Sequence, residues 1–167
     1  PEWPLPKLFR LKKGGKINTG IFEGATINTP SMLATEDYID ALEWAQSIGG
    51  RKAMFERADA NAKLVKDWIE ATPWLRNMVA DPAKQTNTGV CFVFHGDWYD
   101  SLSEEDKAGV PKKIVKLLED RDVGYDFNGY RDAPPSLRIW CGGTVEQEDL
   151  KRLLPWIEWA YEQVKNG

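Results

Sequence analysis

The chain has 167 residues, of which 42% are hydrophobic and 29% charged, a composition typical of a globular protein with a sizeable core. Its 22 lysines and arginines against 26 aspartates and glutamates give a formal net charge of −4, which argues against binding to nucleic acid through bulk positive charge. The sequence has no run of about 18 apolar residues and no signal-peptide pattern at its start, so we expect a cytoplasmic protein without a membrane partner.

The residues that most often bind metals or form disulfides are scarce. Cys91 and Cys141 lie far apart without a CxxC spacing, and His95 is the only histidine, so we expect no metal site. His95 has no Asp or Ser at motif spacing, which leaves a nucleophilic triad unsupported. Both cysteines are interpreted as small buried apolar residues.

The first thirty residues are predicted to be rich in loops, because prolines and glycines interrupt any long hydrophobic period. This segment contains a run of basic residues without an acidic residue between them, which creates a local positive field. The run consists of Lys7, Arg10, Lys12, Lys13 and Lys16. A solvated surface is the simpler interpretation of such a run.

Two helices are predicted next. Apolar residues recur every three or four positions over residues 29–48, and Gly49-Gly50 ends the pattern. A second pattern of the same kind covers residues 54–69 and ends before Pro73. The short glycine link between the two patterns predicts a helical hairpin.

The rest of the chain predicts a small α+β layer. We expect a strand at 89–95, a helix over 103–124, a short extended piece at 125–127, a strand at 137–141, and a last helix over 144–164 with Thr144 as its cap. This order of strand, helix, strand, strand and helix predicts helices packed on one face of a small sheet.

A candidate anion site precedes the first predicted helix. Thr29 is a good N-cap and Pro30 suits the first helical position, so this helix would present free backbone N–H groups and the positive end of its dipole. The side chains of Asn28 and Thr29 would add hydrogen-bond donors to a bound phosphate. An ordinary capped helix is the alternative interpretation.

Two arginines are candidates for binding an anionic ligand. Arg138 lies within a strand-like run, where a rigid backbone suits bidentate capture of a carboxylate, although alternation along the strand equally permits a solvent-facing side chain. Arg131 lies seven residues earlier, behind a Pro-Pro loop, and is a second fixed charge that could reach the same pocket. Two arginines suit a doubly anionic ligand.

Five segments, taken in chain order, carry a family resemblance: WPLPKLFRLKKGG, GIFEGATINTPSML, RADANAKLVKDWIEATPW, YRDAPPSLRIWCGGTVE and LPWIEWA. Together they resemble the C-terminal part of the phosphoserine aminotransferase family, in the form found in alphaproteobacteria and some archaea. The resemblance implies a fold type I enzyme that uses pyridoxal 5'-phosphate and forms a homodimer. It also implies amino transfer between phosphoserine and 2-oxoglutarate in serine biosynthesis.

The resemblance further implies residue roles. The Asn-Thr pair that donates to the cofactor phosphate across the dimer interface corresponds to Asn28 and Thr29. The arginine that binds the substrate α-carboxylate corresponds to Arg138. A His-Arg pair that contacts the substrate phosphate in other branches is matched here by Tyr130 and Arg131. Because tyrosine supplies no cation, we expect the phosphate contact from Arg131 more than from Tyr130.

The lysine that forms the Schiff base with the cofactor precedes the Trp-Pro-Leu-Pro segment in this family, and no lysine of the chain has that context. We therefore expect this lysine upstream of Pro1, no catalytic residue in the chain and no activity from the chain alone. Residues 1–74 are expected to complete the large cofactor domain, and residues 75–167 to form the small C-terminal domain.

Two other functions stay open at this point. A self-standing α+β module that binds a phosphorylated metabolite without catalysis would fit the missing lysine. Another fold type I aminotransferase would share the architecture and differ in its substrate.

Overall fold

The structure is a computed structural model, and it describes residues 4, 6 and 9–167. The chain divides into two compact units, Pro1–Ser47 and Ile48–Gly167. Lys7, the first residue of the predicted basic run, lies outside the described residues. The predicted domain division at residue 74 stays a prediction.

The first unit contains a small β-hairpin where the sequence predicted only loop. Strands β1 (Lys12–Lys13) and β2 (Lys16–Ile17) pair antiparallel around Gly14-Gly15. Both glycines have positive φ angles, 58° and 79°, as a tight two-residue hairpin turn requires. A 3₁₀ turn, η2 (Thr19–Phe22), follows. The lysines of both strands are exposed, in line with a solvated basic surface.

Helix α1 (Met32–Ser47) confirms the first predicted helix but begins later than expected. The Ser31 hydroxyl accepts a hydrogen bond from the Ala34 N–H at 3.3 Å, which is the geometry of an N-cap. The predicted cap at Thr29 is therefore wrong. The physical reason is the start of the helix at Met32, which places Ser31, and not Thr29, at the position from which a hydroxyl reaches an N–H of the first turn.

Helix α2 (Gly50–Ala71) confirms the second predicted helix and extends it by one turn at its start. Gly49 precedes the helix with φ 114°, a conformation that favours glycine. The buried side chains of α2 recur at three- and four-residue steps and form one face: Ala58, Asn61, Ala62, Val65 and Ile69. This face packs against the sheet of the second unit.

That sheet has three antiparallel strands in the order β3-β4-β5, which are β3 (Leu75–Asn77), β4 (Gly89–Phe94) and β5 (Ser136–Trp140). Along β4, buried residues alternate with half-buried ones, so every second side chain enters the core. The Trp68 ring of α2 meets the Phe92 ring of β4 edge to face at 5.6 Å. One face of the sheet is thus covered by helices, as predicted.

The extended piece expected at 125–127 is not a strand. Instead, Phe127 accepts a hydrogen bond from the Arg138 N–H at 2.8 Å, and the Gly129 N–H donates to the Ser136 carbonyl at 3.1 Å. These bonds hold the loop beside β5 over too few residues to extend the sheet. Asp126 interrupts the extended backbone with a φ of 60°.

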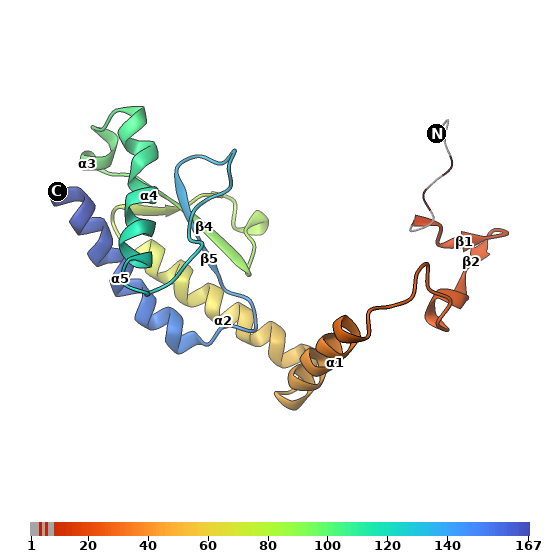
Figure 1. The fold of residues 1–167 in the computed structure, drawn as a ribbon. Coiled ribbons are helices and arrows are strands. Elements are labelled where there is room, and N and C mark those ends of the chain that lie inside the picture. Colours follow the sequence, from red (N-terminus) through yellow and green to blue (C-terminus); the bar gives the residue numbers. More distant parts are fainter. Residues whose placement is uncertain (1–3, 5, 7–8) are drawn as a thin grey trace. The chain divides into compact units, whose positions relative to one another are not determined.

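Helices α3 (Asp97–Asp100), α4 (Glu104–Glu119) and α5 (Gln147–Asn166) complete the second unit. Helix α5 lies beside α2 and also contacts α4 (Figure 1). The predicted cap of the last helix at Thr144 is wrong: the helix starts after Glu146, because residues 142–145 form a turn in which the Val145 N–H donates to the Gly142 carbonyl. In the described part of the chain, no helix is long and apolar enough to cross a membrane.

Candidate functional site

Strand β5 determines where the Arg138 side chain lies. Its neighbours Leu137 and Ile139 are buried in the core, so alternation along the strand directs Arg138 to the opposite face. Its cross-strand partner on that face is Cys91 of β4. The Arg138 side chain is 32% exposed. The guanidinium is therefore half-buried, a setting in which a charge-assisted hydrogen bond is stronger than in open solvent.

Two side chains contact the Arg138 guanidinium. Its Nη2 atom lies 2.9 Å from Oδ2 of Asp126, and its central carbon lies 5.8 Å from the centroid of the Tyr130 ring. Asp126 and Tyr130 both belong to the loop that the backbone hydrogen bonds described above hold beside β5. The sequence reasoning did not single out Asp126, because a charge in a loop carries no signal of the strand it will meet.

Arg138 lines a cavity of about 580 Å³ between β5 and the start of α5. The wall combines aromatic side chains with polar ones and includes Thr86, Thr88, Tyr125, Asp126 and Trp140. A cavity with a fixed guanidinium and an aromatic wall suits a small ligand that carries a carboxylate.

Arg131 lines a different cavity, of about 570 Å³, together with Tyr130, Asn128 and Lys112. The expectation that Arg131 and Arg138 reach one pocket is therefore not met among the described cavities. Tyr130 is near both arginines, since it lines the cavity of Arg131 and its ring lies over the guanidinium of Arg138. Sequence reasoning missed Lys112, which no local pattern distinguishes from the other lysines of its helix.

The wall of this second cavity contains a closely packed backbone. A Cβ atom at Gly129 would come within 2.2 Å of the Ser136 hydroxyl oxygen and 3.3 Å of the Ser136 carbonyl oxygen, so a larger residue there would require the Ser136 side chain to move. Ser136 is buried, and its hydroxyl has no hydrogen-bond partner among the described residues. This close approach keeps the loop that carries Tyr130 and Arg131 against β5.

Asn28 and Thr29 are exposed and lie in the first unit, just before α1. Within the described residues, neither side chain has a hydrogen-bond partner. Their amide and hydroxyl groups, next to the N-terminus of a capped 16-residue helix, form a donor set that fits a phosphate group.

The remaining sequence candidates have structural roles. Cys141 is buried, and burial raises its pKa to about 11. Cys91 is only half-buried; burial raises its pKa, and the positive charge of Arg138 acts in the opposite direction. His95 directly follows β4, and its ring Nε2 lies 2.9 Å from the Leu75 carbonyl oxygen. Over residues 4, 6 and 9–167, no group of three or more candidate side chains is placed to bind a metal ion.

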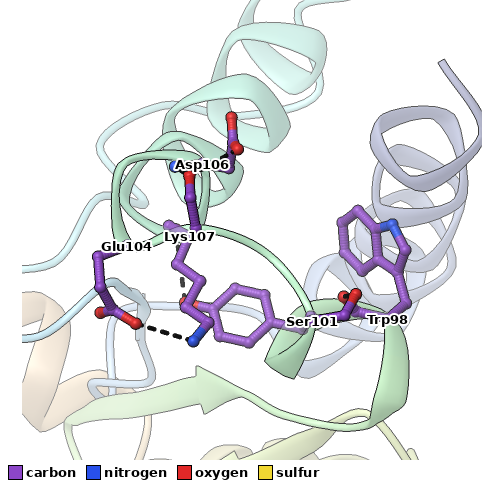
Figure 2. Close-up of polar contacts among 7 residues, drawn as sticks. Trp98, Ser101, Glu104, Asp106 and Lys107 are labelled. Atoms are coloured by element: carbon purple, nitrogen blue, oxygen red, sulfur yellow. Dashed lines mark hydrogen bonds and ion pairs between the residues drawn. The ribbon is translucent and has the colours of Figure 1, made fainter.

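A third cavity, of about 450 Å³, lies beside α4 and contains none of the predicted site residues. Figure 2 shows the Lys107 side chain turned toward Glu104, with Nζ 2.9 Å from Oε1. This hydrogen bond raises the pKa of Lys107, and Glu104 is the ion-pair partner of its ammonium group. Nearby, the Ser101 hydroxyl donates to the Trp98 carbonyl within the α3 turn. The Tyr99 hydroxyl donates to the Lys107 carbonyl at 3.4 Å, and this bond links α3 to α4.

No protein-family model matches the chain. The phosphoserine aminotransferase of Methanosarcina mazei is 48% identical over 165 residues, which are 99% of this chain and 42% of that protein. The chain thus spans less than half the length of the curated relatives it matches.

Solved structures of phosphoserine aminotransferases share the fold of this chain. Phosphoserine aminotransferase from Bacillus circulans subsp. alkalophilus superposes with a TM-score of 0.68 at 22% identity, covering 87% of this chain and 37% of that one. The pyridoxal-phosphate-bound phosphoserine aminotransferase of Trichomonas vaginalis superposes with a TM-score of 0.66 at 20% identity, covering 83% and 36%. In sequence and in fold, the chain is therefore similar over nearly its whole length to the C-terminal portion of phosphoserine aminotransferases.

Proposed function

We propose that this chain is the C-terminal portion of a cytoplasmic, homodimeric phosphoserine aminotransferase of serine biosynthesis. The enzyme would use pyridoxal 5'-phosphate to move an amino group between phosphoserine and 2-oxoglutarate. The observation that carries this proposal is the 48% identity to such an enzyme over 99% of the chain. The half-buried Arg138 in a cavity of substrate size supports it.

Asn28 and Thr29 would hold the cofactor phosphate across the dimer interface. Their side-chain donors have no partner among the described residues, and a neutral donor set at a helix N-terminus suits a phosphate dianion. When bound, pyridoxal 5'-phosphate supplies the electron-accepting ring that amino transfer requires. Asn28 and Thr29 would contribute orientation and charge stabilisation to the bound phosphate.

Arg138 and Arg131 would divide the recognition of the substrate between them. Arg138 would bind the α-carboxylate that phosphoserine and 2-oxoglutarate share, through the planar fork of its guanidinium. Arg131 would bind the phosphate of phosphoserine, and Lys112 in the same cavity adds a second cation suited to a doubly charged group. Arg138 lies on β5, a rigid element, which favours precise positioning, and Arg131 lies in the loop that precedes this strand.

The first test uses the full-length protein with its upstream sequence. We expect Arg138→Ala to raise KM for both phosphoserine and 2-oxoglutarate by about 10- to 100-fold, since a hydrogen bond to a charged group contributes roughly 1.5–3 kcal/mol. The absorbance of bound cofactor should stay unchanged. Arg152→Ala, which removes an exposed arginine of α5 outside the described cavities, is the matched control. Unchanged KM values in Arg138→Ala would refute the carboxylate assignment.

A second measurement separates this proposal from its alternatives. Arg131→Ala should raise KM for phosphoserine and leave KM for 2-oxoglutarate unaltered; equal KM values for phosphoserine in the variant and the parent would favour a different aminotransferase. Calorimetry of the 167-residue chain alone with phosphoserine should show no tight binding. Tight binding by the isolated chain would favour a non-catalytic module instead.

A further inference from the structure

We infer that Asp126 and Tyr130 together orient Arg138, so that Tyr130 acts as a positioning residue for the carboxylate site and not as a ligand of the substrate phosphate. This inference rests on the proposed role of Arg138. It assigns a role to Tyr130, whose ring lies over the guanidinium of Arg138.

The contact with Asp126 leaves most of the guanidinium available. One Nη2 to Oδ2 contact of 2.9 Å engages a single edge of a group that has five N–H donors. The remaining donors can still form a bidentate pair with a substrate carboxylate. Asp126 is 84% exposed, so this ion pair contributes little to stability, and its effect is to restrict the rotamers of Arg138.

The backbone around Asp126 sets the direction of its carboxylate. The residue has a φ of 60°, which is uncommon for a non-glycine residue, and the Arg138 N–H donates to the carbonyl of the next residue, Phe127, at 2.8 Å. Main chain and side chain of Arg138 are therefore both tied to the same short loop segment. A rotation of the guanidinium away from the cavity would break the side-chain contact while the backbone stays in place.

The Tyr130 ring provides the second contact. Its centroid lies 5.8 Å from the central carbon of the guanidinium, within the range of a cation–π interaction. The same residue lines the cavity of Arg131, so the ring lies between the places proposed for the carboxylate and for the phosphate. The ring face, and not the hydroxyl, carries this interaction.

Two contacts on one guanidinium reduce the entropy that Arg138 would otherwise lose when a substrate binds. Loss of either contact should therefore raise KM and leave kcat unchanged. In the full-length holoenzyme, we expect Tyr130→Leu and Asp126→Ala each to raise KM for 2-oxoglutarate and for phosphoserine by about 3- to 10-fold. Tyr130→Phe keeps the ring and should stay within about twofold of the parent.

The effect of Tyr130→Leu on KM should depend on the presence of Arg138 if Tyr130 positions that residue, and should not depend on it if the substitution causes a general structural defect. In an Arg138→Ala background, Tyr130→Leu should change KM by less than about twofold, because the group it orients is gone. Asp67→Ala is the matched control for Asp126→Ala: its exposed carboxylate also pairs with a cation, Lys63, but lies on α2 outside the described cavities. We expect this control to leave both KM values unchanged.

Three outcomes would overturn the inference. If Asp126→Ala lowers KM, Asp126 competes with the substrate and does not orient Arg138. If Tyr130→Leu raises KM for phosphoserine alone, Tyr130 is a phosphate ligand. If Arg138→Ala raises both KM values while Tyr130→Leu and Asp126→Ala do not, Arg138 needs no positioning and the proposed function stands. An Arg138→Ala variant without effect would instead refute the carboxylate assignment of the proposed function.

Discussion

At the scale of single residues, the turn after β5 is held by a short segment of α2. Asn61 is 1% exposed, and its side-chain amide donates to the Val145 carbonyl at 2.9 Å. One turn earlier, the Arg57 Nε donates to the Gly143 carbonyl at 2.7 Å. These bonds satisfy backbone carbonyls that a turn leaves without partners. They place the start of α5, and with it one wall of the Arg138 cavity.

Gly143 is a position of this turn at which a side chain would meet backbone. A Cβ atom there would come within 2.7 Å of the Met54 carbonyl oxygen, which is backbone and cannot move aside cheaply. We expect Gly143→Ala to lower the free energy of unfolding by about 1–3 kcal/mol, as overpacking does, measured by urea denaturation.

Gly109→Ala is the opposite case and serves as the control. Gly109 lies inside α4, where a Cβ would meet only the flexible end of Lys113 at 4.0 Å. Alanine there should raise the stability by up to about 1 kcal/mol, because glycine is a poor helix former. Equal effects of the two substitutions would contradict the proposed close approach.

At the scale of elements, a serine hydroxyl caps the start of two helices, α1 and α4. Ser31 caps α1, and Ser103 caps α4 by accepting the Asp106 N–H at 3.1 Å. The Ser103 hydroxyl also donates to the Asp106 carboxylate at 2.7 Å. The first turn of α4 contains acidic residues, whose negative charge interacts favourably with the positive end of the helix dipole. Helix α5 has no side-chain cap, so its start depends on the turn that α2 holds.

The cap of α4 leads to a prediction at this scale. Ser103→Ala should lower the free energy of unfolding by about 1 kcal/mol, because the Asp106 N–H loses its partner at the helix end. Ser103→Thr retains a hydroxyl and should recover most of this loss. A thermal unfolding series of the three proteins measures the effect, and equal midpoints in all three would show that the cap is not needed.

At the scale of the whole molecule, the buried core belongs to the second unit. Among the described residues, every buried hydrophobic side chain lies between Ala58 and Tyr161, and α1 contains none. The large apolar side chains of the first unit that the structure describes are instead exposed, as Phe22, Met32 and Leu33 are. A unit without a buried core contributes little to cooperative unfolding.

We therefore expect a chain truncated to residues 48–167 to unfold cooperatively, with a midpoint within about 3 °C of the 167-residue chain, because the core is retained. Differential scanning calorimetry of both proteins is the measurement. A broad transition or a strong drop of the midpoint in the truncated chain would show that the first unit supports the core.

The sequence by itself determined the elements whose signals are local. Helical periodicity over residues 29–48 and 54–69 located α1 and α2, and the apolar run at 89–95 located β4, because side-chain spacing reports directly on helix and strand geometry. The ordered resemblance also led from the sequence to phosphoserine aminotransferases, which the comparisons bear out. Its place in a strand-like run, together with that resemblance, makes Arg138 a site candidate.

Only the tertiary structure decided what depends on distant parts of the chain. The three-residue strand β3 was missed, and residues 125–127 did not become a strand, because pairing partners and not local pattern decide short strands. The separate cavities of Arg131 and Arg138, and the contacts of Asp126 and Tyr130 with Arg138, arise from a loop folded back on β5. Such contacts join residues that have no periodic relation in the sequence, so only the folded chain brings them together.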